Sequence, residues 1–341
     1  MILSDRESCK AQQYRMRIHR SIEMNGSILP SAEAIIRAIP AEFLHHEAHG
    51  LKHPLAVYQT SLARVGAAWT KIFPLLHTLR FEVMGGVEHQ SYSQVLQAYE
   101  ALLYRLNEHV DAAYEILRSL LPPDGKSYFS HAQALKTQKL AGYMGFRDVV
   151  QRGWRESHIG AIVNLLKHES AQLRAVCGET EDDILLGFYV DGPRPGGFIG
   201  PNLKVHRRFG MLETAFTFAR DMLMHFWWIY RTGDALTECI HAAVLKDHGR
   251  KLVENPGRGA QGVWQDVCLG CAQVRPAFFI DECQKNYPLV VVPPDASEVR
   301  LDFPSGRVAS GHRHMKLRVL IGVTEMTRSF VMPYMQKRGP S

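Results

Sequence analysis

The chain has 341 residues, of which 46% are hydrophobic and 22% are charged, so it can bury one large core or two ordinary ones. Its formal net charge of +6 comes from Lys and Arg residues spread along the chain, which is compatible with RNA as a partner but does not indicate it. No stretch reaches the roughly 20 apolar residues of a membrane span, the first residues lack the apolar segment of a signal peptide, and six cysteines suit a reducing compartment. We therefore expect a cytoplasmic protein without a membrane partner.

The first 54 residues are predicted to form an N-terminal arm with short helices. Residues 1–30 are polar and irregular, and the helical pattern that follows is interrupted by Pro40 and Gly50. From residue 55 to residue 80 apolar side chains recur at helical spacing until two glycines end the segment. The main body of the chain is therefore expected to begin near residue 55.

The clearest helix is predicted for residues 96–120. Its apolar residues recur at alternating spacings of three and four, which is the pattern of a helix with one buried face. They are Leu96, Tyr99, Leu103, Leu106, Val110, Ala113, Leu117 and Leu120. Ser91 or Ser93 can cap its start and Pro122 stops it after about eight turns, a length that suits the spine of a helical bundle.

A second long helix is predicted for residues 146–174, packed antiparallel to the first. One broad face is apolar, and on the opposite face Asn164 and His168 form an i, i+4 pair whose side chains lie side by side. An Asn amide can hold a phosphate oxygen or a ribose hydroxyl, and a His side chain exchanges protons near neutral pH. The pair is therefore a candidate site for activating a ribose hydroxyl. The alternative is a pair that only hydrogen-bonds its neighbours.

Small residues surround this pair, namely Gly153, Ser157, Gly160, Ala161, Ala171 and Ala175. A Gly inside a helix costs about 1 kcal/mol relative to Ala, and a second copy of the helix packed closely on the strip would offset that cost. We therefore expect a homodimer. The alternative is that the strip seats the 96–120 helix within one chain.

The rest of the chain divides into a helical part and a β-containing part. Residues 187–202 are rich in Gly and Pro and predict an irregular connection, and two further helices are predicted for 214–231 and 235–253. From Asn255 onward, short apolar runs (AFFI, PLVVVP, EVRLDF and MKLRVLIGV) indicate strands. The predicted fold is mostly α, with an arm (1–54), a helical bundle (55–254) and a small β-containing C-terminal extension (255–341).

This order of elements resembles the HEPN superfamily of helical proteins over roughly residues 55–250. In that family two antiparallel helices dimerise, and an Arg-x4-6-His motif, often written Arg-Asn-x3-His, is a metal-independent RNase site. Asn164 and His168 match the motif, but Val163 stands where the Arg is expected. A second register, Arg152-x5-His158, keeps both Arg and His.

The resemblance implies an RNA-directed protein, such as a metal-independent endoribonuclease in a toxin or defence setting. It makes His168 the acid and base and Asn164 the group that positions phosphate or ribose, with Lys167, Arg174 or Arg152 supplying the missing charge. The other function that it implies is a non-catalytic dimeric scaffold that keeps the bundle. No cofactor is required for the RNase.

Cysteines indicate a separate zinc hypothesis. Cys268-x2-Cys271 and Cys283 offer three thiolates, and His312 or His314 would complete a Cys3His site in a module that mediates partner binding. The alternative is three buried thiols without a metal. Elsewhere, the segment Trp154-Arg155-x2-His158 is similar to the haem-ligand helix of tryptophan dioxygenases, but the Gly-rich continuation of that family does not follow it, and we expect no haem there.

Overall fold

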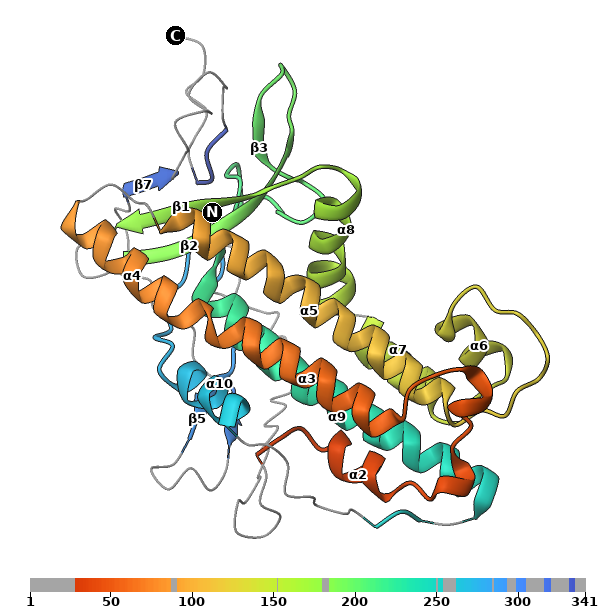
Figure 1. Cartoon of the computed structure of the whole chain (residues 1–341). Coiled ribbons are helices and arrows are strands. Elements are labelled where there is room, and N and C mark those ends of the chain that lie inside the picture. Colours follow the sequence, from red (N-terminus) through yellow and green to blue (C-terminus); the bar gives the residue numbers. More distant parts are fainter. Residues whose placement is uncertain are drawn as a thin grey trace, which may run out of the picture.

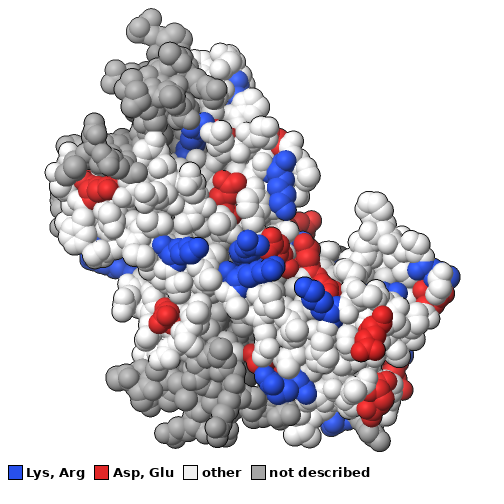
Figure 2. All heavy atoms as spheres, in the orientation of Figure 1, with Lys and Arg blue, Asp and Glu red and all other residues white. Residues whose placement is uncertain are grey.

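The computed structural model describes residues 28–334 except for 87–90, 152, 180–183, 250, 254–261, 284, 293–298, 305–315 and 320–330. The chain is mostly α, as predicted, and its long helices pack as a bundle with a small sheet at one end (Figure 1). None of the described helices is both long enough and apolar enough to cross a membrane. On the face drawn in Figure 2, basic and acidic side chains are interspersed.

The described helices are α2 (Ala32–Ala38), α3 (Pro54–Thr70), α4 (Ile72–Gly85), α5 (Tyr92–Arg118), α6 (His131–Thr137), α7 (Tyr143–Gln151), α8 (Gly160–His168), α9 (Phe218–His248) and α10 (Gly262–Ala272). Two turns of 3-10 helix lie at Ala41–Phe43 and Glu47–His49, and a turn of π-helix lies at Arg155–Ile159.

The bundle is built on α5, the helix predicted most clearly from its apolar spacing. Its buried face includes Tyr99, Leu103, Leu106, Val110 and Leu117, all of them members of the predicted stripe. The main partner of α5 is α3, and α9 also packs on it (Figure 1). The predicted antiparallel pairing with one helix over residues 146–174 is wrong, because that segment is not one helix.

Residues 146–174 instead form α7, the π-helical turn, α8 and the start of a strand. Gly153 has a φ of +104°, a left-handed conformation that interrupts the segment after α7. Ser170, with a φ of +54°, follows the end of α8. Of the small residues expected on one helix face, Ala171 lies beyond α8 and Ala175 is buried in a strand. The continuous strip that predicted the homodimer interface therefore does not exist.

The main sheet is antiparallel and comes largely from residues expected to be helix or irregular. It contains β1 (Leu173–Glu179), β2 (Ile184–Pro193), β3 (Ile199–Pro201), β4 (Phe216–Thr217) and β7 (Lys316–Val319), in the order β3-β2-β1-β7 with β4 on β2. Gly187, which counted as a breaker, lies opposite Thr217 in β4. An added Cβ at Gly187 would lie 2.3 Å from the Phe216 carbonyl oxygen, so glycine allows the two strands to approach.

Helix α9 is one helix where two were predicted. The Gly233 position does not break it: an added Cβ there would lie 3.0 Å from Pro30, so glycine makes room for the N-terminal segment. Ser31 also donates a hydrogen bond from Oγ to Asp234 at 2.7 Å. The residues expected to be an arm therefore include a segment that packs on the middle of α9.

The C-terminal strand signals are confirmed in three of four cases. The runs PLVVVP, EVRLDF and MKLRVLIGV contain β5 (Leu289–Val291), β6 (Arg300–Asp302) and β7, whereas AFFI forms no strand. Strand β5 pairs with β6, and β7 joins β1 of the main sheet. One cluster of buried apolar side chains runs from Ile28 to Leu301, so the core continues across the boundaries expected at residues 54 and 254.

Candidate functional site

Three ionisable side chains meet inside the bundle: His158, Asp221 and His225. Asp221 and His225 are one turn apart on α9, and His158 comes from the π-helical turn before α8. Their side chains are 4%, 1% and 0% exposed, and their ligand atoms all lie within 4.8 Å of one another. In the part of the chain that the structure describes, this is the one group of at least three His, Cys, Asp or Glu side chains so arranged.

Asp221 is the centre of the group. Its Oδ1 lies 2.5 Å from His158 Nε2, and its Oδ2 lies 3.2 Å from His225 Nε2. The Tyr99 hydroxyl donates a hydrogen bond to Oδ2 at 2.5 Å. Burial alone would raise the pKa of Asp221, but the two neighbouring imidazoles hold it below its usual range. Burial and the Asp221 charge raise the pKa of Tyr99 well above its usual value, so the phenol stays a donor.

A hydrogen bond from Trp154 decides where the proton of His225 lies. The indole Nε1–H donates to His225 Nδ1 at 2.9 Å, so Nδ1 is an acceptor and the ring is neutral. Its one proton is then on Nε2, facing Asp221, and Nε2 has no lone pair for a metal ion. Two His and one carboxylate can form a metal site, but this donor pattern fits a proton-holding network better.

His158 connects this network to a hollow. Burial lowers the pKa of His158, so its ring is neutral near pH 7. The Nε2 atoms of His158 and His225 are both sealed from solvent, and both approach Asp221 without good hydrogen-bond alignment. With the proton on the Nε2 that faces the carboxylate, the lone pair of His158 is on Nδ1, which has no partner among the described residues and is not sealed. Trp154 stacks on the ring at 4.2 Å and Phe216 meets it edge-on at 4.6 Å, which holds its plane.

The hollow has a volume of about 600 Å³ and a cationic lining. Five basic side chains face it, against two carboxylates, Glu156 and Asp281; the five are Lys204, Arg207, Arg208, Arg220 and Lys285. Arg220 lies over the Trp154 ring at 5.8 Å and donates to the Asn286 carbonyl, while its buried Nε has no partner among the described residues. Three of the five are ion-paired, Lys204 with Glu169, Arg208 with Glu213 and Lys285 with Asp281. Arg207 and Arg220, which form no ion pair among the described residues, leave the positive charge that favours a small anionic ligand.

The N-terminus of α9 holds Asp221 in place. Thr217 caps the helix, its hydroxyl accepting from the Arg220 amide, and Glu282 accepts from both the Thr217 amide (3.0 Å) and hydroxyl (2.7 Å). Asp221 lies in the first turn, where the helix dipole stabilises a negative charge. Burial raises the pKa of Glu282 to about 7.

The residues predicted for RNA cleavage lie elsewhere. Asn164, Lys167 and His168 are all exposed on α8, so the Asn–His pair is a surface pair, as its spacing predicts. Asn164 opens onto a separate hollow with Arg147 and Arg155. The Lys167 ammonium lies over the Tyr104 ring at 5.2 Å.

The predicted role of Arg174 in binding RNA needs a correction. Arg174 is not on the helix but in β1, where it is buried and its Nε donates to Asp191 Oδ2 at 2.8 Å. A buried Arg paired in this way neutralises a core carboxylate and is not available to a phosphate of RNA. Arg152, the other predicted cation, lies outside the described residues.

The three cysteines of the zinc hypothesis do not converge among the described residues. Cys268 and Cys271 are buried on α10, and Cys283 is buried with its thiol toward the Phe278 carbonyl at 3.6 Å. They form no group of three ligand atoms in the part described. Burial raises the pKa of Cys268 to about 12, which keeps the thiol protonated near pH 7. His312 and His314 lie outside the described residues.

In the sequence, His158 belongs to two motifs, Arg152-x5-His158 and the segment similar to a haem-ligand helix, and no function is expected there for Asp221 or His225. One signal was present: an Asp and a His four residues apart within an otherwise apolar stretch of helix. Comparison with protein-family models, with curated proteins and with solved structures gives no significant match for this chain.

Proposed function

We propose that the protein is an enzyme that transfers a proton to or from a small anionic molecule, with His158 as the general base and acid. One observation carries the proposal: His158 faces a buried carboxylate with one ring nitrogen and lines a cationic hollow of about 600 Å³. A neutral His held by a buried Asp is a recurrent arrangement for general acid–base catalysis.

The surrounding residues have separate roles in this proposal. Asp221 orients the His158 ring and stabilises the imidazolium formed when Nδ1 takes a proton. Tyr99 and His225 hold the carboxylate, and Trp154 holds His225. The basic side chains of the hollow bind the anionic group of the substrate and favour negative charge that develops in the transition state.

Deuterium exchange tests the proposal. The wild-type protein is incubated in D₂O with a panel of small 2-oxo acids, and NMR follows the loss of carbon-bound hydrogen. His158→Gln should slow exchange by about 10²- to 10⁴-fold, the usual contribution of a general base. His168→Gln is the matched control, because it removes an exposed His from the neighbouring helix and should leave the rate unchanged. No exchange with any member of the panel, or equal rates in wild type and His158→Gln, would contradict the proposal.

An RNA-directed function at Asn164 and His168 is the second candidate. It is favoured by the exposed i, i+4 pair and by the hollow in which Arg147 and Arg155 stand near Asn164, since either could replace the cation that Val163 lacks. In this function the protein is a metal-independent ribonuclease, or a dimeric scaffold that has lost the chemistry. Degradation of total RNA in EDTA that stops in His168→Ala supports the ribonuclease, and a mass of one chain by light scattering rules out the dimer.

A further inference from the structure

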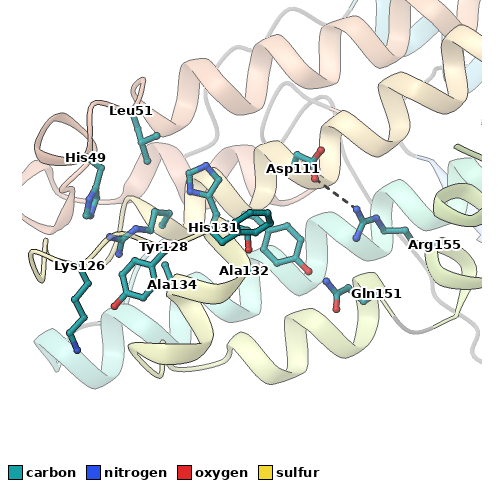
Figure 3. Close-up of a pocket in the computed structure, with 14 residues that line it drawn as sticks. His49, Leu51, Asp111, Lys126, Tyr128, His131, Ala132, Ala134, Gln151 and Arg155 are labelled. Atoms are coloured by element: carbon teal, nitrogen blue, oxygen red, sulfur yellow. Dashed lines mark ion pairs between the residues drawn. The ribbon is translucent and has the colours of Figure 1, made fainter. Parts of the chain in front are cut away.

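A second cavity, of about 540 Å³, lies at the other end of the bundle, where α5 ends. Figure 3 shows His49 and Leu51, from the turn before α3, at one end of it and Asp111, Gln151 and Arg155 at the other. None of its lining residues also lines the hollow beside His158. What this cavity does is therefore independent of the proposed acid–base site.

The cavity contains a buried cation that has no counterion among the described residues. Arg118, the last residue of α5, is 7% exposed, and among the described residues its guanidinium has no carboxylate partner and no hydrogen bond. Its Nη1 is sealed from solvent with no partner there. A buried charge is costly unless it is paired and hydrogen-bonded, so the position calls for an anion.

The groups that Arg118 does touch do not replace an anion. Its guanidinium lies over the Tyr128 ring at 5.5 Å, and its place at the C-terminus of α5 is favourable for a cation. Neither interaction gives the guanidinium N–H groups an oxygen to bind. The planar donor fork of Arg matches the oxygens of a phosphate or carboxylate group.

The other polar groups of the cavity also favour an anion. The Tyr114 hydroxyl is buried, and the Gln151 side chain approaches it without completing a hydrogen bond. Lys126 lies at the rim and forms no ion pair within 4 Å among the described residues, although its charge acts on the carboxylate of Asp124. The one carboxylate of the lining, Asp111, is already paired with Arg155 at 3.8 Å (Figure 3).

We propose that this cavity binds the phosphate group of a phosphomonoester, with the Arg118 guanidinium as its anchor. Arg118 has no carboxylate partner among the described residues, and Lys126 adds a second positive charge at the rim, so the cavity suits a dianion better than a monoanionic carboxylate. The volume far exceeds that of a phosphate group, so the organic part of the ligand lies against the Tyr128 and Tyr114 rings.

Isothermal titration calorimetry tests this with three probes. Phenyl phosphate should bind the full-length protein, inorganic phosphate should bind more weakly because it lacks the ring, and benzoate should bind at least tenfold more weakly than phenyl phosphate. Arg118→Gln should weaken phenyl phosphate at least tenfold, and Tyr114→Phe severalfold. Arg105→Gln is the matched control: it removes an exposed, paired Arg from the same helix and should change the Kd by less than twofold.

Three results would overturn the proposal. They are no binding of phenyl phosphate at millimolar concentration, benzoate binding as tightly as phenyl phosphate, or an unchanged Kd in Arg118→Gln. If Arg118→Gln cannot be purified, Tyr114→Phe decides, because it removes a single oxygen atom: weaker binding supports the site, and an unchanged Kd overturns it.

Discussion

Trp154, which is half-buried, donates its indole N–H to Nδ1 of the buried His225 at 2.9 Å. This hydrogen bond links the segment before α8 to the N-terminal part of α9 and determines which nitrogen of His225 carries the proton. With Nδ1 used as an acceptor, Nε2–H is left to face Asp221. With its protons placed in this way, the cluster does not offer three lone pairs to one ion, and the arrangement suits the proposed acid–base role.

Cobalt titration tests this conclusion. Because His225 Nε2 carries a proton, we expect Co²⁺ added to the wild-type protein to give no visible ligand-field bands that depend on the cluster. The spectra of wild type and Asp221→Asn should therefore coincide. Bands that appear with Co²⁺ in the wild type and vanish in Asp221→Asn would show that the three side chains bind a metal.

Tyr99 should contribute to stability through Asp221. Its hydroxyl donates to a buried carboxylate, and such a bond to a charged group contributes about 1.5–3 kcal/mol. We expect Tyr99→Phe to lower the free energy of unfolding by that amount in urea. Tyr104→Phe, on the same helix but with its hydroxyl on the half-buried Glu100, should lower it by less than about 0.5 kcal/mol. If Tyr99→Phe and Tyr104→Phe lower the free energy of unfolding equally, the hydrogen bond from Tyr99 does not stabilise the buried Asp221 carboxylate.

The raised pKa of Glu282 should make the stability of the folded protein depend on pH. Burial raises its pKa from 4.5 to about 7 in the folded protein, so between these values the folded chain binds more protons than the unfolded chain. The contribution of Glu282 to the free energy of unfolding is complete below pH 4.5 and is lost as the pH rises to about 7. At 1.36 kcal/mol per pH unit, the loss is at most about 3 kcal/mol.

The variant Glu282→Gln keeps an oxygen for Thr217 and cannot ionise. Its free energy of unfolding should therefore fall less than that of the wild type between pH 5 and pH 8. Glu238→Gln, an exposed position on α9, should follow the wild type. A pH profile unchanged by Glu282→Gln would show that this carboxyl does not titrate in that range.

Replacing Gly187 tests the close packing of β2 on β4, and Gly145 on α7 is the control. An added Cβ at Gly187 would lie 2.3 Å from the Phe216 oxygen and 2.5 Å from the Phe279 ring, so Gly187→Ala should destabilise the protein by about 1–3 kcal/mol or more. Gly145 on α7 has open space around it, and Gly145→Ala should stabilise by up to about 1 kcal/mol. Melting temperatures that move in the same direction for both variants would contradict the described packing.

The spacing of apolar residues along the chain correctly predicted the elements with a regular apolar pattern. The stripe of α5 repeats regularly enough to define a helix with one buried face, and three apolar runs near the C-terminus form strands. The segment 146–174 was misread because its apolar residues fit helical spacing on both sides of Ser170. Two left-handed residues interrupt it, Gly153 after α7 and Ser170 in the short link between α8 and β1, and spacing does not reveal them. Gly187 was misread because a glycine that admits a neighbouring strand looks like a glycine that ends one.

The candidate site was harder to predict because its members are far apart in the chain. His158 and Asp221 are 63 positions apart, and Tyr99 is 122 positions before Asp221. Only the packing of α5, the π-helical turn and α9 brings them together. The Asn164–His168 pair was easier to notice because both residues lie on one helix, and its role in RNA cleavage stays a prediction.

The most direct test of the acid–base site is the tautomer of His158, measured by ¹⁵N NMR on protein labelled in its imidazole nitrogens. We expect His158 to be neutral at pH 7 with its proton on Nε2, and a small anion such as pyruvate, bound in the hollow, to shift the Nδ1 resonance. His168, on the surface of α8, should not respond to the anion. A His158 ring with its proton on Nδ1, or an Nδ1 resonance that no anion of the 2-oxo acid panel moves, would rule out His158 as the base that acts on a ligand in the hollow.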